Sequence, residues 1–452
     1  MIRGRRYFYG IPVSSPPVLA PTTMQSSVSQ YGITLTFDQA YPVGQYYTGD
    51  YFVVGPVTIN SVSPAWTGPQ NGCMVNPSSG GNQGWDSTTL VNNFTSALRQ
   101  SFPATIQPGS SVCPAISHAS GTRPQISDMM VLTVVSSAPY ADSFRPPLIG
   151  TDKTTWRWSN VNTALLPNLA TTASTPADLS TYIDGMTRPW PLHCNNWQGR
   201  HFHATNNMPS DYYQWIGLFL AEASTLLMMN HSQRDELLAK YIQVGIDYYA
   251  MGSQGEGTSA YWTMPVILTG VLLGDTDISD LYIDGRDQHT IVGQGPRYYP
   301  LYDISTEQLS TVVSGIVPAG KTWTGKDVGW RQSEISSNCY EQEHLHPDEW
   351  DSVSSSEGCT QDISTRETYR RIGSQFFVGL CCAMVAMGME AKQPKVDLYK
   401  AYVKRWMEED LHNTGHDPYG DGTTTIAAAD FYGTSRSDFV DEFYAAHVES
   451  LL

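Results

Sequence analysis

The sequence predicts a multidomain fold of α and β structure, in which a β-sandwich-like domain precedes a mainly α-helical domain of toroid-like form. Three observations support this prediction. The length of 452 residues exceeds the size at which a single hydrophobic core stops growing. Apolar and polar side chains alternate over residues 31–150, as in strands, and residues 151–452 carry apolar side chains at three- and four-residue spacing, as in helices.

Residues 1–30 are basic and then rich in Pro and Ser, which predicts an extended arm. The arm begins with the basic run "RGRR" at residues 3–6, but Pro12, Pro16 and Pro17 interrupt any apolar core of a secretory signal. We therefore expect no standard signal peptide. The arm is a candidate for joining a homo-oligomer or a larger assembly, such as a virion whose proteins are released by lysis.

The strand-like texture of residues 31–150 is clearest in "GITLTFDQAY", "GDYFVVGPVTINSVSP" and "MMVLTVVSSAP". Gly, Pro, Asn and Ser separate these runs. Before residue 150 the one helical candidate is the short stretch "TTLVNNFTSALRQ". This pattern is typical of a β-sandwich-like domain.

Five amphipathic segments predict helices in the second half: residues 210–229, 233–251, 260–275, 365–389 and 394–412. Two packings fit them, a compact bundle and a toroid of helix hairpins around a cleft. The connecting loops are long and rich in Gly, His, Trp, Tyr and Asn, as in "GSQGEGTSAYW" and "HNTGHDPYGDGTTT". Loops of that length are usually functional, so we favour the toroid.

The charge balance limits the classes of partner. With 26 Lys and Arg against 43 Asp and Glu, the net charge is −17, which argues against a nucleic-acid partner because phosphate binding needs a basic surface. Neither "WIGLFLAEASTLLMM" nor "FFVGLCCAMVAMGM" is long enough to span a membrane, and Glu222 interrupts the first. Aromatic residues make up 11% of the chain, and Tyr and Trp rings suit contact with sugars.

The seven cysteines form neither a metal-binding pattern nor a dense disulfide framework. Cys339 and Cys359 flank a polar loop and are candidates for a disulfide. Cys381 and Cys382 lie in an apolar helical segment, which favours buried thiols.

Several stretches together resemble a known group of proteins. They are "FDQAYPVGQYYTGDYFVVGPVTI", "NMPSDYYQWIGLFLAEASTLL", "MPVILTGVLLGD" and "YVKRWMEED". The chain resembles, over most of residues 31–410, a largely uncharacterised group of bacterial proteins from polysaccharide degraders. Their helical half is similar to the (α/α)-toroid of polysaccharide lyases. This resemblance implies an extracellular site of action on a polysaccharide.

A lyase acting on a uronic acid needs a group that neutralises the carboxylate, a base, and an acid for the leaving oxygen. Residues 195–213 are dense in such groups. By analogy with toroid lyases, we expect Asn206 or His201 to neutralise the carboxylate, and Tyr261 or Tyr340 to act as acid and base. The expected substrate-binding residues are Trp197, Arg200, His203, Tyr212, Trp262 and Arg370. In the alternative interpretation, Asn206 and Asn207 merely precede a helix that Ser210 caps.

Three further clusters have weaker signals. The first cluster could supply the acid and base of a glycoside hydrolase, could bind a metal ion, or could be a solvated acidic loop. Its members are Glu341, Glu343, His344, His346, Asp348, Glu349 and Asp351. The second, with Arg366, Tyr369, Arg370 and Arg371, is either a local positive site or a set of surface ion pairs. The third places Asp417 and Asp421 like a calcium loop, but Tyr419 and Ala428 stand where ligands should be. We expect no cofactor, with calcium as a weak alternative.

Three functions remain open from the sequence. A polysaccharide lyase explains the polar, aromatic loops on a helical scaffold. A glycoside hydrolase of (α/α) type explains the same loops and suits an acidic protein acting on neutral sugars. A structural or adhesive virion component, such as a phage tail or fibre protein, explains the basic arm. The products of glycan cleavage, or their absence, distinguish the three.

Overall fold

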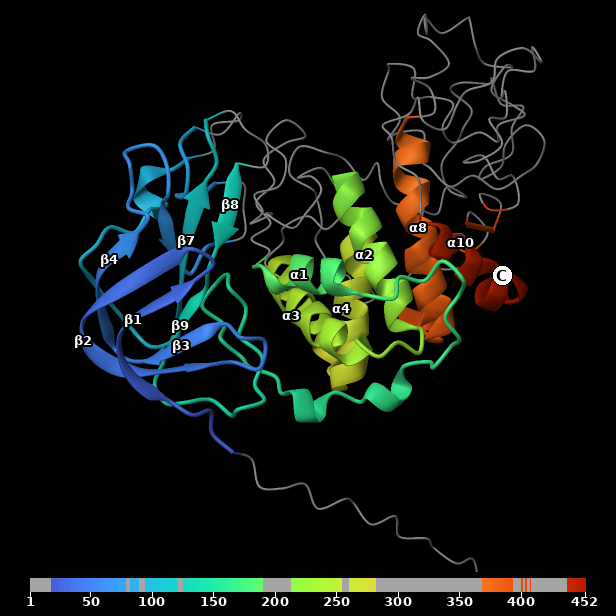
Figure 1. Ribbon diagram of the computed structural model, residues 1–452, viewed down its shortest axis with the longest axis horizontal. Coiled ribbons are helices and arrows are strands. Elements are labelled where there is room, and N and C mark those ends of the chain that lie inside the picture. The colour runs from blue at the N-terminus through green and yellow to red at the C-terminus, as the bar shows by residue number, and fades with distance from the viewer. Residues whose placement is uncertain are drawn as a thin grey trace, which may run out of the picture.

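The computed structural model describes residues 18–78, 82–88, 94–120, 125–189, 213–253, 260–281, 368–392 and 437–452, with Lys400, Val403, Lys404 and Met407. At 213–215, 252–253, 260–262 and 368–375 it describes the backbone alone. A curled β-sheet comes first and helices follow, so the expected mixture of α and β structure is confirmed (Figure 1).

The strands within the described residues form one hydrogen-bonded sheet of nine. They are β1 (Thr23–Gln30), β2 (Ile33–Gln45), β3 (Tyr51–Val54), β4 (Val57–Ser63), β5 (Cys73–Val75), β6 (Ala104–Ile106), β7 (Ser110–Ser117), β8 (Ile126–Met129) and β9 (Leu132–Val135). The order is β5-β7-β9-β3-β2-β4-β6, with β1 paired to β2 and β8 to β7. Neighbours are antiparallel except β3 and β9, which are parallel.

Strand β2 explains why the domain resembles a sandwich and yet consists of one sheet. It is 13 residues long and pairs with β4 near its start, through Thr34–Phe37, and with β3 near its end, through Val43–Gln45. A register shift at Thr36/Phe37 interrupts its pairing with β4, and such irregularities let a strand bend from one layer into the next. The sheet therefore curls instead of dividing into two separate sheets.

The curl brings the two end strands of the sheet together. The amide of Gln100, shortly before β6, donates a hydrogen bond of 2.7 Å to the carbonyl of Cys73 in β5. Inside the curl, side chains from β1, β2, β3, β4, β5, β6, β7 and β9 form one core, which includes Leu35, Ile59 and Val112. The sheet is thus nearly closed on itself around its own apolar interior.

Strand β1 lies inside the segment that we expected to be an arm. Residues Thr23–Gln30 pair with β2 over most of their length, so ordered structure begins well before residue 31. The sequence "TMQSSVSQ" is mostly polar, and only Val28 is buried. An exposed edge strand of this kind has no apolar period for sequence reasoning to detect.

The helices of the described residues confirm four of the five predicted segments. They are α1 (Ser180–Thr187), α2 (Tyr213–Leu227), α3 (Arg234–Ser253), α4 (Ala260–Leu273), α5 (Thr276–Ser279), α8 (Thr368–Ala386) and α10 (Asp438–Phe443). Short 3₁₀ turns cover Ser96–Leu98, Trp158–Asn160, Thr163–Leu165, Glu390–Lys392 and Glu449–Leu451, and a π-helical turn covers Tyr444–Val448. Most of the fifth segment, 394–412, lies outside the described residues. None of the helices described is both long enough and apolar enough to cross a bilayer.

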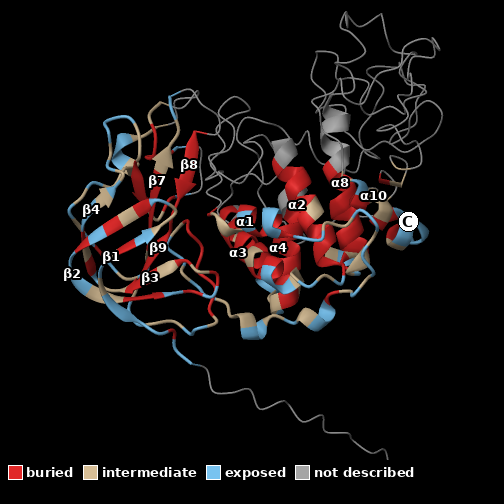
Figure 2. Ribbon diagram, viewed as in Figure 1, coloured by how far each residue is buried: buried red, intermediate tan, exposed pale blue. Residues whose placement is uncertain are grey.

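The helices and the outer face of the sheet share a second core. Alternation along β5 places Cys73 in the interior of the curl and Met74 in the core that includes α2, α3, α4 and α8. Cys381 and Cys382 are buried free thiols in this second core, as predicted. Figure 2 shows that the described parts of α2 and α8 are buried along most of their length.

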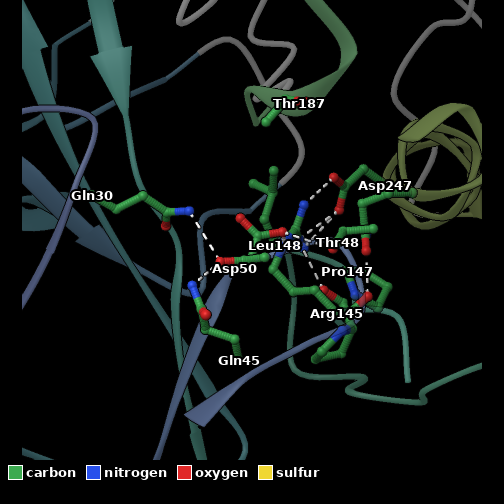
Figure 3. Close-up of polar contacts among 12 residues, drawn as sticks. Gln30, Gln45, Thr48, Asp50, Arg145, Pro147, Leu148, Thr187 and Asp247 are labelled. Atoms are coloured by element: carbon green, nitrogen blue, oxygen red, sulfur yellow. Dashed lines mark hydrogen bonds and ion pairs between the residues drawn. The ribbon is translucent and has the colours of Figure 1, made fainter. Parts of the chain in front are cut away.

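A buried guanidinium joins the sheet to the helices (Figure 3). Arg145 follows the last strand, and its Nε lies 3.1 Å from Oδ2 of Asp50 at the start of β3. Its Nη1 and Nη2 lie 3.0 and 2.5 Å from the two carboxylate oxygens of Asp247 on α3. Asp247 also accepts a hydrogen bond from the amide of Leu148, and all three charged side chains are at most 5% exposed.

We expect Arg145→Met to lower the free energy of unfolding by about 3–5 kcal/mol, because removing one partner leaves buried carboxylates without compensation. Chemical denaturation followed by circular dichroism measures this loss. The matched control is Arg157→Met, whose partner Asp142 is partly exposed, and it should cost about 1 kcal/mol or less. Equal losses in the two variants would contradict a special role for the buried cluster.

A partly buried carboxyl group, that of Glu222, connects three helical elements. It lies on α2 and accepts a hydrogen bond of 2.8 Å from the hydroxyl of Tyr182 on α1 and another from Ser437, which precedes α10. Burial raises the pKa of Glu222 above its ordinary value of 4.5, although both hydroxyls act in the opposite direction. The ionised form therefore reduces the stability of the fold.

We expect Glu222→Gln to stabilise the protein at neutral pH, because the amide removes the charge and can still bond to both hydroxyls, accepting from one and donating to the other. The raised pKa determines how the stability gained by the variant depends on pH. Below pH 4.5 the carboxyl is protonated in both states and the variant gains nothing, whereas the gain grows as the pH rises through the folded-state pKa. Thermal midpoints across this pH range test the expectation.

The control for this experiment is Glu442→Gln on α10. Hydrogen bonds from Ser174 lower the pKa of Glu442, which is the opposite direction. This variant should not be more stable than the wild type at neutral pH. A gain in both variants would point to a general effect of net charge instead of the burial of Glu222.

Candidate functional site

Helices α2 and α4 begin at the same end of the helical half. Six residues, 228–233, connect α2 to α3, and six more, 254–259, connect α3 to α4. Connections of this length join antiparallel neighbours, and α3 and α4 are in contact, with Gly245 against Thr269. Two successive reversals make α4 parallel to α2, so their first turns face the same side.

Helix α8 begins at this end as well. Gly217 of α2 lies against the ring of Phe376, and Ala221, one turn later, lies against Gly379 of α8. A Cβ atom on Gly217 would approach the Phe376 ring to 2.7 Å, so glycine permits this close contact. The contacts advance in the same direction along both helices, which makes them parallel. Figure 1 shows both first turns at the upper end of the helices.

Three predicted site residues belong to these first turns by their backbone. Tyr261 and Trp262 are in the first turn of α4, and Arg370 is in the first turn of α8. Tyr212 immediately precedes α2 in the sequence. The topology thus brings together chain segments that are separated by more than a hundred residues, although the described part of the structure does not include these side chains.

The other predicted site residues lie outside the described residues: Trp197, Arg200, His201, His203, Asn206, Tyr212 and Tyr340. The same holds for Cys339, Cys359, the acidic cluster of residues 341–351, and the calcium-like stretch with Asp417 and Asp421. Within the described ranges, no three His, Cys, Asp or Glu side chains gather as a metal site requires. The roles proposed for the residues outside the described ranges stay predictions.

The electrostatics of this end favour an anion. Each helix start presents backbone N–H groups that have no partner within the helix, and the positive end of the helix dipole. The first turns of α2, α4 and α8 contain no Asp or Glu, whereas α3 has Asp235 and Glu236 in its first turn. Asp211 and Glu367 precede α2 and α8, outside the described residues, but Arg370 and Arg371 add positive charge within α8.

A polar cluster fixes the chain at residue 188, shortly before the candidate residues of 195–213 in the sequence. Arg188, directly after α1, lies 3.2 Å from the carboxylate of Asp128 in β8 and 3.9 Å above the ring of Tyr31. The hydroxyl of Tyr31 donates a hydrogen bond of 3.3 Å to the carbonyl of Thr187. Burial raises the pKa of Asp128 and of Tyr31, against the influence of the Arg188 guanidinium.

Sequence reasoning did not identify this cluster. Arg188 and Asp128 are 60 residues apart, and Tyr31 and Thr187 are 156 apart, so no local pattern indicates the contacts. The cluster anchors the end of α1 to the sheet. It therefore fixes the point from which the chain continues toward the predicted site residues of 195–213, and its own side chains are engaged with one another.

Comparisons of the chain with protein-family models, with curated proteins and with solved structures found no match. The resemblance to toroid polysaccharide lyases therefore stays a prediction based on the quoted stretches. The candidate site depends on two independent arguments: the chemistry of the residues around 195–213, and the common end at which α2, α4 and α8 begin.

Proposed function

We propose that the protein is a polysaccharide lyase that cleaves a uronate-containing glycan by β-elimination, with its active site at the end where α2, α4 and α8 begin. One observation carries the proposal: three helix starts without acids in their first turns share one side of a protein of net charge −17. An anionic substrate group gains from such a site, and a neutral sugar does not.

The proposed chemistry assigns each segment a task. The carboxylate of the sugar is neutralised by Asn206 or His201, which makes the adjacent C–H proton more acidic. Tyr261 or Tyr340 removes this proton and returns a proton to the leaving oxygen. Arg200 and Arg370 attract the acidic chain, and Trp197, His203, Tyr212 and Trp262 contact the sugars. The place of action is extracellular, where such glycans occur.

The (α/α)-toroid is part of this proposal. The succession α2, α3, α4 runs up and down through short connections, which is the unit from which a toroid of hairpins is built. A toroid places the ends of its inner helices around one cleft. The common end of α2, α4 and α8 is the counterpart of such a cleft.

We expect Asn206→Ala and His201→Ala to lower turnover by about 10²-fold or more, the range found when one preorganised donor to a developing charge is removed. The unfolding midpoint should change little. Absorbance of the unsaturated uronate product measures turnover, and a thermal melt of the same samples measures stability.

The control for these variants is Ser210→Ala. If residues 206–210 only cap and brace α2, all three variants lose about 1 kcal/mol of stability and keep their activity. That pattern would contradict the catalytic assignment. Cleavage without an unsaturated product would favour the hydrolase, and no cleavage of any acidic glycan by the wild type would favour the structural alternative.

We expect the double variant Arg200→Gln/Arg370→Gln to bind an acidic oligosaccharide more weakly and with less dependence on salt, because screening acts on the charges that have been removed. Calorimetric titrations at low and moderate ionic strength measure both effects. Arg234→Gln is the control, since this residue begins α3 at the opposite end of the helices. Unchanged affinity in the double variant would remove the polyanion as substrate.

A further inference from the structure

A pocket lies at the seam where the curled sheet closes. It occupies about 330 Å³ and is lined by the end of β4, the start of β5 and the segment before β6. This volume is at the lower end of the range for small-molecule sites. Strand β4 lies on the side of the sheet away from α2 and α8, so the pocket is separate from the candidate active site (Figure 1).

One wall of the pocket holds an arginine on an aromatic ring. The guanidinium carbon of Arg99 lies 4.8 Å from the ring centroid of Trp66, and Trp66 is stacked with Phe94 at 5.7 Å. The cation–π contact holds the planar guanidinium in place. An arginine held in this way presents a fork of donors that fits a carboxylate.

Arg99 differs from the other arginines whose side chains the structure describes. Arg145, Arg157, Arg188 and Arg234 each have an Asp oxygen within 4.0 Å. For Arg99, no carboxylate of the described residues lies within that distance. The positive charge beside the pocket is therefore left for a ligand, in a protein with an excess of acids.

The remaining walls offer neutral polar groups. Asn60 donates only a long hydrogen bond of 3.4 Å to the carbonyl of Phe37, and Gln100 donates from Nε2 to the carbonyl of Ser101. Within the described residues, the amide oxygens of Asn60 and Gln100 and the hydroxyl of Ser101 have no hydrogen-bond partner. Groups of this kind bind sugar hydroxyls, and the Trp66 indole offers apolar contact for a sugar ring.

We propose that this pocket binds an acidic sugar, with the carboxylate on Arg99 and the ring hydroxyls on Asn60, Gln100 and Ser101. The inference rests on the proposed function for the class of glycan and adds a second binding site, away from the site of cleavage. The sheet domain thereby holds the polymer while the helical half acts on it.

The test compares D-glucuronate with D-glucose, which differ in the carboxylate at C6. Calorimetric titration uses the full chain carrying Arg200→Gln and Arg370→Gln, so that the proposed active site contributes little binding. We expect this protein to bind glucuronate more tightly than glucose. Adding Arg99→Gln should weaken glucuronate binding tenfold or more and leave glucose unchanged, since a charge-assisted pair is lost.

Two further variants sharpen the test. In the same Arg200→Gln/Arg370→Gln background, Arg99→Lys keeps the charge but loses the fork, so its affinity for glucuronate should lie between those of the proteins with Arg99 and with Arg99→Gln. Arg157→Gln is the matched control, because Arg157 also stacks on a ring, that of Tyr140 at 4.4 Å, but is paired with Asp142. This control should bind glucuronate as before.

The outcomes separate this inference from the proposed function. Glucuronate affinity that is unchanged by Arg99→Gln, or equal affinity for glucose, would contradict the inference that the pocket binds an acidic sugar. This holds even if the unsaturated product of a lyase forms. Conversely, Arg99-dependent binding without any such product would support the binding pocket and contradict the proposed lyase activity.

Discussion

The arrangement of the two halves depends on one guanidinium that serves two buried carboxylates. Asp50 directly precedes β3 and Asp247 lies on α3, and neither can be buried as an anion without Arg145 between them. Burial raises the pKa of Asp247, and the Arg145 guanidinium acts against that change. Lys240, also on α3, donates a hydrogen bond of 2.6 Å to the carbonyl of Thr48, which strengthens the same junction. The position of α3 on the sheet is therefore specified by polar partners as well as by apolar packing.

The fixed position of α3 has consequences for the candidate site. Because α2 and α4 are joined to α3 by short connections and pack into the same core, their first turns are placed once α3 is placed. Parallel packing then adds α8 through the small residues Gly217, Ala221 and Gly379. Functional groups are held best on rigid elements. A buried ion cluster at one side of α3 thus helps to define where three helix starts meet.

The part of the fold that sequence reasoning found is the part with strong periodicity. Strands β2 and β4 alternate over part of their length, β3 and β9 are short apolar runs, and α2, α3, α4 and α8 are long and apolar on most faces. Most of the elements it missed are short or polar: β5 and β6 have three residues each, β1 is an exposed edge strand, and α10 has six residues. Strand β7 was missed as well, although it is eight residues long and largely buried. The missed strands are stabilised by pairing with distant strands, which their local sequence does not indicate.

Within the site, sequence reasoning found residue types but not their partners. Arg99, Arg145 and Arg188 are single arginines among polar and apolar neighbours, and nothing in their local sequence distinguishes them. Their surroundings distinguish them. Arg145 is buried between two carboxylates, Arg188 is paired with Asp128 and stacked on a ring, and Arg99 lies at a pocket with no described carboxylate within 4.0 Å. Such differences arise from contacts between residues that are distant in the sequence, from 33 positions for Arg99 and Trp66 to 102 for Arg145 and Asp247, which a single sequence does not display.

The net charge of −17 sets a condition on any acidic glycan that this protein holds. Surface repulsion acts over a Debye length of about 8 Å at physiological ionic strength, so a polyanion approaches only where local charge outweighs the surroundings. Attraction must come from within that distance of the ligand, because more distant cations are screened. The starts of α2, α4 and α8 and the Arg99 pocket are the candidates for such local attraction, since those first turns contain no Asp or Glu and no carboxylate of the described residues lies within 4.0 Å of the Arg99 guanidinium. An acidic protein can thus bind an acidic polymer at separate points, and repulsion from the rest of the surface discourages attachment elsewhere.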